Sequence, residues 1–160
     1  MTLTLRAYDT ADRAACHGVF RRAVHEGAAD AYDAAQRAAW APDTDPQGPD
    51  RLLDQWCLVA ERAGRIAGFL SMTPAGHLDM AFVLPEEMGR GTAAALYDAL
   101  EARARAAGLP RLTADASHLA RPFLERRHWR VEAAESVERN GQYLDRFVMS
   151  RDLAGVPADA

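Results

Sequence analysis

Two glycines, Gly89 and Gly91, stand where a short apolar run gives way to an alanine-rich segment. That segment keeps its apolar residues at helical spacing until Gly108 and Pro110, which favour the end of a helix. The sequence therefore predicts a strand, a glycine turn and a helix over residues 91–107. The first N–H groups of a helix have no partner within it, so such a turn is suited to binding an anion such as a diphosphate.

The glycine turn alone is a weak signal, because most turns of this kind bind nothing. The sequence lacks the Gly-Lys-Ser/Thr ending of a phosphate-binding loop, and Ala94 stands at the last position of a Gly-x-Gly-x-x-Gly fingerprint. Arg90 and Thr92 offer a charge and a hydroxyl to a bound diphosphate. The surrounding segments must decide between a binding turn and a purely structural one.

The rest of the chain alternates strand and helix patterns. Helices are predicted over residues 11–25, 30–40 and 118–128. Strands are predicted over residues 3–9, 56–61, 65–72, 77–84, 111–117, 129–138 and 143–153. This order predicts one mixed α/β domain over residues 1–153, followed by a frayed tail over 154–160.

Composition excludes several classes of protein. Among 160 residues, 23 are acidic and 19 are basic, so no basic footprint for nucleic acid is expected. No apolar run approaches a membrane span, and the N-terminus lacks a signal-peptide pattern. Cys16 and Cys57 form no metal-binding spacing and no disulfide framework is expected, which favours a reducing, cytoplasmic location. Every basic residue counted is arginine, so a catalytic lysine is excluded.

Several motifs together resemble the GCN5-related N-acetyltransferase (GNAT) family, in a small bacterial branch. Residues 88–93 are similar to the family's Gln/Arg-x-x-Gly-x-Gly/Ala pattern, and "AFVLP" over 81–85 is similar to the strand before it. "ASHLARPFLERRHW" over 116–129 is similar to the family's Asn-x-x-Ala-x-x-x-Tyr-x-x-x-Gly-Phe segment. Residues 32–42 and 137–153 also resemble this branch, so the resemblance covers nearly the whole chain.

The resemblance implies the acyl-CoA N-acyltransferase fold, an α/β (α+β) domain whose mixed, mostly antiparallel sheet of six to seven strands is flanked by four helices. It implies an enzyme that transfers the acetyl group of acetyl-CoA to a primary amine by direct attack in a ternary complex, without a metal. The acceptor is a small molecule or a peptide, and the protein is a monomer or a homodimer. The mildly acidic balance favours a cationic amine acceptor.

The resemblance also implies where the coenzyme lies. The main-chain amides from Gly89 to Ala93 hold the pyrophosphate, and the main chain of the preceding strand bonds the pantetheine arm. Ser117 matches the family's Asn position and either bonds the coenzyme or caps the following helix. The coenzyme-binding residues implied are Phe82, Val83, Met88, Gly89, Arg90, Gly91, Thr92, Ala93 and Ser117.

Three positions depart from the family pattern. Met88 replaces Gln or Arg, so a side-chain contact is lost while the backbone N–H remains a donor. Leu124 stands where many relatives have the tyrosine that protonates the departing thiolate. Another hydroxyl, water or the substrate must do so, or the thiolate leaves unprotonated. His128 and Trp129 replace Gly-Phe, and a non-glycine residue tolerates a left-handed turn less well.

Acetyl transfer needs a neutral amine, which a general base supplies. Asp79 is the first candidate, because strand alternation places it on the face of Ala81, near the expected thioester. His77 lies one step further along that face, with an ordinary pKa near 6.5. The structural alternatives are an ion pair for Asp79 and a solvated turn for His77. Glu26 is a third candidate, with a surface helix charge as the favoured alternative.

The acceptor pocket is expected between the first two helices and the last hairpin, with core packing as the alternative for its aromatic residues. The predicted acceptor-binding residues are Glu26, Tyr32, Trp40 and Tyr143. Two other functions stay open: a module that binds acyl-CoA without turning it over, and a nucleotide-binding or structural domain in which the glycines only form a turn.

Overall fold

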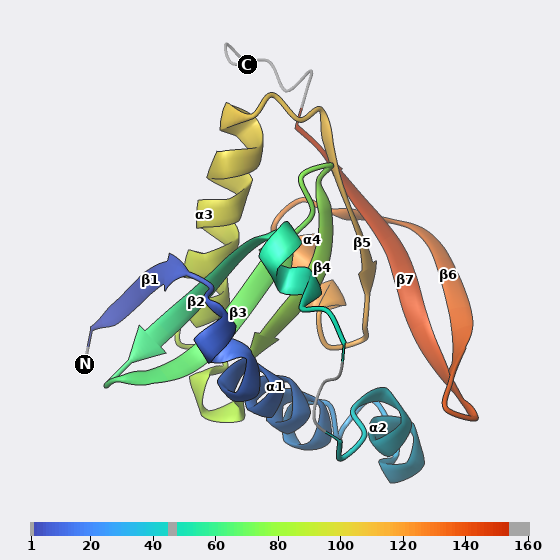
Figure 1. The fold of residues 1–160 in the computed structure, drawn as a ribbon. Coiled ribbons are helices and arrows are strands. Elements are labelled where there is room, and N and C mark those ends of the chain that lie inside the picture. Colours follow the sequence, from blue (N-terminus) through green and yellow to red (C-terminus); the bar gives the residue numbers. More distant parts are fainter. Residues whose placement is uncertain (1, 45–47, 154–160) are drawn as a thin grey trace.

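The centre of the fold is one seven-stranded sheet in the order β1-β2-β3-β4-β5-β7-β6 (Figure 1). The computed structural model describes residues 2–44 and 48–153, so the predicted tail over 154–160 lies outside the described residues. Neighbouring strands are antiparallel except β4 and β5. The strands are β1 Leu3–Ala7, β2 Trp56–Arg62, β3 Arg65–Met72, β4 His77–Val83, β5 Arg111–Ala116, β6 Arg130–Arg139 and β7 Gln142–Asp152. The predicted mixed, mostly antiparallel sheet is confirmed.

Helices cover both faces of this sheet. In the described residues the α-helices are α1 Arg13–Arg22, α2 Ala34–Trp40, α3 Thr92–Ala106 and α4 Arg121–Arg126. Leu96 of α3 packs in one apolar cluster with Leu70 of β3, whereas Val19 of α1 packs in another with Phe69. Successive strand residues point to opposite faces, so α1 and α3 lie on opposite sides of β3.

The N-terminal helices differ from their predicted boundaries. The predicted helix over 11–25 is divided into a 3₁₀ turn, α1 and a π-helical turn over Ala23–Gly27. Asp9 caps its start. The second helix begins at Ala34, because the Asp33 side chain accepts a main-chain N–H in the first turn and fixes the N-cap there.

The parallel pairing of β4 and β5 is short. It joins His77 to Thr113 and Leu78 to Ala114, and no later residues of the two strands are paired. The strands diverge towards their carboxyl ends (Figure 1). The sheet is therefore open beyond Leu78, between its central strand β4 and the neighbouring β5.

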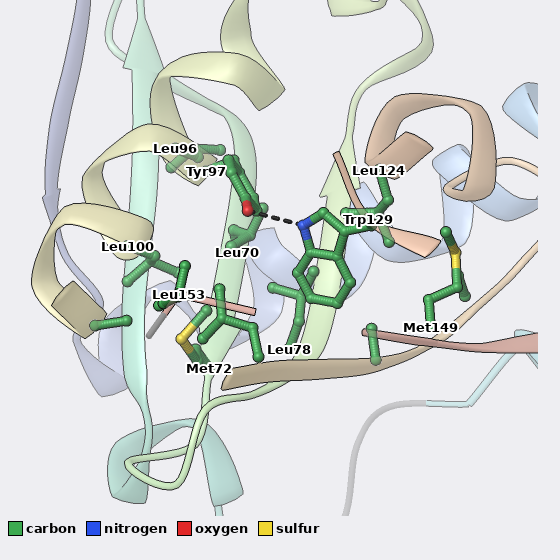
Figure 2. Packing of buried hydrophobic residues seen from close by; sticks show 14 of the residues in the cluster. Leu70, Met72, Leu78, Leu96, Tyr97, Leu100, Leu124, Trp129, Met149 and Leu153 are labelled. Carbon is green, nitrogen blue, oxygen red and sulfur yellow. Dashed lines mark hydrogen bonds between the residues drawn. The ribbon is translucent and has the colours of Figure 1, made fainter. Parts of the chain in front are cut away.

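The main apolar cluster fills the α3 side of this sheet (Figure 2). Trp129 is 4% exposed, and its indole Nε1 donates a hydrogen bond of 2.8 Å to the Tyr97 hydroxyl. Tyr97 in turn donates to Glu101 at 2.7 Å. Leu124 is buried beside Trp129 in the same cluster. Because each buried polar tip has a partner, both large rings are buried without an unpaired donor.

His128 ends α4 in a left-handed conformation, with φ of 71°. The N–H of Trp129 donates to the Leu124 carbonyl at 3.1 Å, and the His128 N–H donates to the Glu125 carbonyl at 3.1 Å. These two bonds form a Schellman motif, in which glycine is the preferred residue at the left-handed position. The histidine therefore keeps the backbone that the family's Gly-Phe pattern implies.

We expect His128→Gly to raise the free energy of unfolding by about 0.5–1 kcal/mol, because relief of left-handed strain exceeds the extra chain entropy of glycine. The His128 side chain is exposed, so little packing is lost. Urea unfolding measures the change, and His128→Ala is the control, because it keeps the Cβ and should gain little. Equal gains in both variants would contradict the strain argument.

Candidate functional site

Two cavities meet at the opening between β4 and β5. The first, of about 620 Å³, lies between β4, the N-terminus of α3 and α4. The second, of about 380 Å³, lies between β4, β5, α2 and β7. The residues that line both are Leu78, Ala81, Phe82, Ser117, Ala120 and Leu124. We call this set the shared wall.

The glycine turn closes one end of the first cavity. Gly89 and Gly91 have φ of 78° and 84°, a left-handed conformation that favours glycine. Gly91 is the N-cap of α3, and its side-chain position is open. The main-chain N–H groups of Gly89, Gly91, Thr92 and Ala93 have no acceptor within the described residues. Such a group of amides at a helix N-terminus is suited to a phosphate.

Glu87 stands behind the turn and was missed by the sequence analysis. Its carboxylate is 6% exposed and accepts hydrogen bonds from Thr92 Oγ1 at 2.7 Å and Arg62 Nε at 3.0 Å. Arg90 Nη1 lies 3.3 Å from its second oxygen. Burial alone would raise the pKa of Glu87, but the bonds from Thr92 and Arg62 outweigh it and lower the pKa. Glu87 thus ties the turn to β2.

This network corrects what the turn's side chains offer. The Thr92 side chain is fully buried and its hydroxyl donates to Glu87, so this hydroxyl is not free to bond a diphosphate. The Arg90 charge is partly balanced by Glu87. The Met88 side chain lines the cavity, but the Met88 N–H donates to the Pro85 carbonyl at 3.2 Å. The Met88 N–H, which was expected to remain a donor for the ligand, therefore already has an acceptor within the protein.

The main-chain N–H and C=O groups of β4 point alternately towards β3 and towards β5. Leu84 N–H donates to the Ala67 carbonyl, and antiparallel partners alternate, so the main-chain groups of Phe82 face β3. Those of Ala81 and Val83 face the opening beside β5. The prediction of a main-chain contact is therefore corrected for Phe82 and kept for Val83, while the Phe82 ring lines both cavities.

A β-bulge sets the direction of Asp79. Met72 pairs with Leu78 and Ser71 with Met80, which leaves Asp79 as the extra residue. His77, Asp79 and Ala81 line the second cavity together. The bulge interrupts the strict alternation along β4 from which their shared face was predicted. The bulge could not be read from the sequence, because it depends on the register with β3.

Both candidate bases have partners. Asp79 Oδ2 accepts a hydrogen bond of 2.9 Å from Gln55 Nε2 and lies 3.2 Å from Arg51 Nε. The Arg51 side chain is 65% exposed, so this ion pair can exchange with solvent or substrate. His77 Nδ1 lies 2.8 Å from Thr113 Oγ1 on β5. These contacts hold both side chains in place at the start of the opening.

The aromatic residues of the second cavity are fixed by packing and hydrogen bonds. Tyr32 is 4% exposed, and its hydroxyl donates to the Asp145 carbonyl at 2.9 Å and accepts the His118 N–H at 3.0 Å. The Trp40 ring packs edge-on against Tyr32, with centroids 5.3 Å apart. Both line the second cavity, where the acceptor pocket was predicted.

Two other predicted acceptor residues lie elsewhere. Glu26 forms an exposed ion pair with Arg22 at 2.9 Å and lines neither cavity. Tyr143 is 64% exposed. Its neighbour Leu144 lines the second cavity, so alternation along β7 turns Tyr143 away. Neither Glu26 nor Tyr143 therefore lines the cavity in which the acceptor pocket was predicted.

Ser117 stands at the end of β5, on the shared wall. Its Oγ accepts the Ala120 N–H at 3.1 Å, so Ser117 caps the turn that leads into α4, whereas the N-cap of α4 itself is Ala120. Leu124, at the position where the family resemblance implies a tyrosine, is buried on the same wall.

A family model described as an acetyltransferase (GNAT) domain matches residues 28–150. The chain belongs to the GNAT family. It is 31% identical to the protein described as uncharacterized N-acetyltransferase YafP of Escherichia coli (strain K12), over 92% of this chain and 94% of that protein.

Solved structures of GNAT proteins have the same fold. One of a GCN5-related N-acetyltransferase from Rhodopseudomonas palustris, also described as an aminotransferase, class-II, has a TM-score of 0.89 and 34% identity, and covers 96% of this chain and 97% of its own. The PaiA N-acetyltransferase of Thermoplasma acidophilum, in complex with coenzyme A, has a TM-score of 0.75 and 15% identity, and covers 95% and 99%.

Residues 2–44 and 48–153 contain no helix long and apolar enough to cross a membrane. The same residues contain no group of three or more His, Cys, Asp or Glu side chains placed to hold a metal ion.

We expect Glu87→Gln to weaken acetyl-CoA binding about three- to tenfold, because loss of a buried charge releases the turn from Arg62. Calorimetric titration measures the dissociation constant. Glu86→Gln is the matched control, because Glu86 is an exposed neighbour that pairs with Arg22 and Arg65. Equal weakening in both variants would contradict a specific role for Glu87.

Proposed function

We propose that the protein transfers the acetyl group of acetyl-CoA to a primary amine by direct attack in a ternary complex. The observation that carries the proposal is the meeting of two cavities at the opening between β4 and β5. One cavity ends on unpaired amides at a helix N-terminus, and the other contains the two candidate bases, His77 and Asp79. An acetyl donor bound in the first cavity and an amine acceptor bound in the second would meet at the shared wall.

In this proposal the pyrophosphate binds the amides of the glycine turn, and the pantetheine arm follows β4. The main-chain groups of Ala81 and Val83 are free to bond it, because no strand pairs with that edge of β4 beyond Leu78. An N–H of this edge polarises the thioester carbonyl, which stabilises the charge that develops on its oxygen.

The amine enters through the second cavity. Asp79 or His77 takes a proton from the ammonium form, directly or through water, because only the neutral amine has a lone pair. Cys16 and Cys57 line neither cavity, and burial raises the pKa of each thiol to about 12. A covalent acyl-cysteine intermediate is therefore disfavoured.

The proposal does not name the amine that accepts the acetyl group. The second cavity presents aspartates at 79, 115 and 145 and arginines at 51, 139 and 146. This balance gives no support to the cationic amine that the acidic composition favours. The alternative, a module that binds acyl-CoA without turnover, is distinguished by measuring free thiol on mixing with a panel of amines.

We expect acetyl-CoA to bind in calorimetric titration while ATP does not, because the pantetheine arm needs the free edge of β4. Gly91→Asp should weaken binding at least about tenfold, because it places a carboxylate at the amide cluster. Gly64→Asp is the matched control, since Gly64 has φ of 78° in an open hairpin turn outside both cavities. If Gly91→Asp binds acetyl-CoA as tightly as the wild type, the glycine turn is not part of the coenzyme site.

We expect Asp79→Asn to lower kcat about 100-fold at neutral pH with little change in acetyl-CoA affinity, because a general base contributes roughly 10²–10⁴-fold. Thiol release measures kcat and calorimetry measures affinity. Asp54→Asn, an exposed carboxylate outside both cavities, is the control. If kcat is retained in Asp79→Asn and lost in His77→Gln, the base is His77.

A further inference from the structure

The shared wall is almost entirely apolar. Of its six residues, Leu78, Ala81, Phe82, Ala120 and Leu124 have side chains that carry no proton to exchange. Ser117 is the exception among the described residues. A step that moves a proton between the two cavities through a protein side chain therefore has one candidate on this wall.

The Ser117 hydroxyl still has the free donor and the free acceptor that a proton relay needs. A hydroxyl has one donor hydrogen and two acceptor lone pairs. Ser117 Oγ accepts the Ala120 N–H at 3.1 Å, and its own hydrogen has no acceptor in the described part of the chain. One donor and one lone pair remain. The bond from Ala120 also fixes the oxygen at the end of β5, where the two cavities meet.

The other hydroxyls of the two cavities are already committed. Thr92 donates its hydrogen to Glu87 at 2.7 Å, and Tyr32 donates its hydrogen to the Asp145 carbonyl at 2.9 Å. Either would have to break a buried hydrogen bond to serve a substrate. In residues 2–44 and 48–153, Ser117 is thus the cavity hydroxyl that needs no rearrangement.

We propose that Ser117 is a catalytic residue that relays a proton from the attacking amine to the departing sulfur. This inference rests on the proposed acetyl transfer. The amine lone pair adds to the thioester carbon, and the carbonyl electron pair moves to oxygen. As the C=O bond reforms, the C–S bond breaks and its electron pair goes to sulfur. Ser117 Oγ takes one proton from the nitrogen and gives its own hydrogen to the sulfur.

The products are the amide and the free thiol of coenzyme A, and the serine is restored. A serine hydroxyl is a weaker acid than a thiol, so it does not protonate sulfur unless it gains a proton at the same time. Its position between the donor and acceptor cavities allows both transfers. The relay supplies the proton that Leu124 is unable to provide.

Three variants separate the relay from the cap. Ser117→Ala removes both functions. Ser117→Asn keeps an acceptor for the Ala120 N–H but has no group that passes a proton on. Ser117→Thr keeps both functions. Ser136→Ala, which removes an exposed hydroxyl on β6, is the control for loss of a serine outside the cavities.

We expect kcat for thiol release, with acetyl-CoA and the best amine of a panel, to fall about 10²-fold or more in Ser117→Ala and Ser117→Asn. Ser117→Thr should stay within about threefold of wild type, and acetyl-CoA affinity should change little in all three. Recovery of kcat in Ser117→Asn would show that the cap alone matters, and would overturn the relay. Unchanged kcat in Ser117→Ala would overturn it as well.

A second measurement uses coenzyme A alone and needs no acceptor. The thiolate absorbance of the bound coenzyme gives the pKa of its thiol. A hydrogen bond from Ser117 stabilises the thiolate, so this pKa should rise by about one unit in Ser117→Ala and return in Ser117→Thr. If the thiol pKa does not rise in Ser117→Ala, the proposal is overturned. This result does not depend on whether threonine fits the site and restores kcat.

The two proposals fail in different ways. If the wild type binds coenzyme A but releases no thiol with any amine, acetyl transfer fails while the thiol pKa still tests the contact with Ser117. In that case a pKa rise supports the contact and its absence overturns it. If the wild type turns over and the Ser117 variants match it, the relay alone fails. If coenzyme A does not bind, both fail.

Discussion

The short parallel pairing of β4 and β5 is the constraint on which the site depends. The two strands share only two residue pairs, and beyond Leu78 the edge of β4 has no partner strand. An unpaired strand edge inside a sheet has to be satisfied by water or a ligand, because buried main-chain groups are costly when left alone. The opening thus creates the two cavities and the free edge between them. The bulge at Asp79, next to the opening, turns a carboxylate towards one of them.

Rigid elements surround this opening. The apolar cluster around α3, which includes Tyr97 and Trp129, packs against one side of the sheet. The Schellman motif at His128 joins α4 to β6. Glu87 fixes the glycine turn to β2 through Arg62. A phosphate site needs amides that are already aligned, since ordering them on binding would cost affinity. The buried carboxylate is placed to supply that alignment through its hydrogen bonds with Thr92 and Arg62.

Much of the fold could be predicted from local sequence. The order of strands and helices along the chain and the glycine turn before α3 depend on neighbouring residues, and the structure confirms them. The corrected expectations have two causes. Strand register directs the Phe82 main chain and the Tyr143 side chain away from the positions expected of them. Glu26 and the Thr92 hydroxyl instead have nearby partners, Arg22 and Glu87, which a residue pattern alone does not reveal.

The sequence by itself determined the family, the order of the elements and the left-handed glycines at 89 and 91, because these follow from short-range periodicity and backbone sterics. Only the tertiary structure decided which side chains reach the two cavities. Register with β3 creates the bulge at Asp79, and Arg62 from β2 makes Glu87 a buried anchor. The meeting of β5 with α4 places Ser117 on the shared wall. These are contacts between distant segments, and they exist only when the chain has closed on itself.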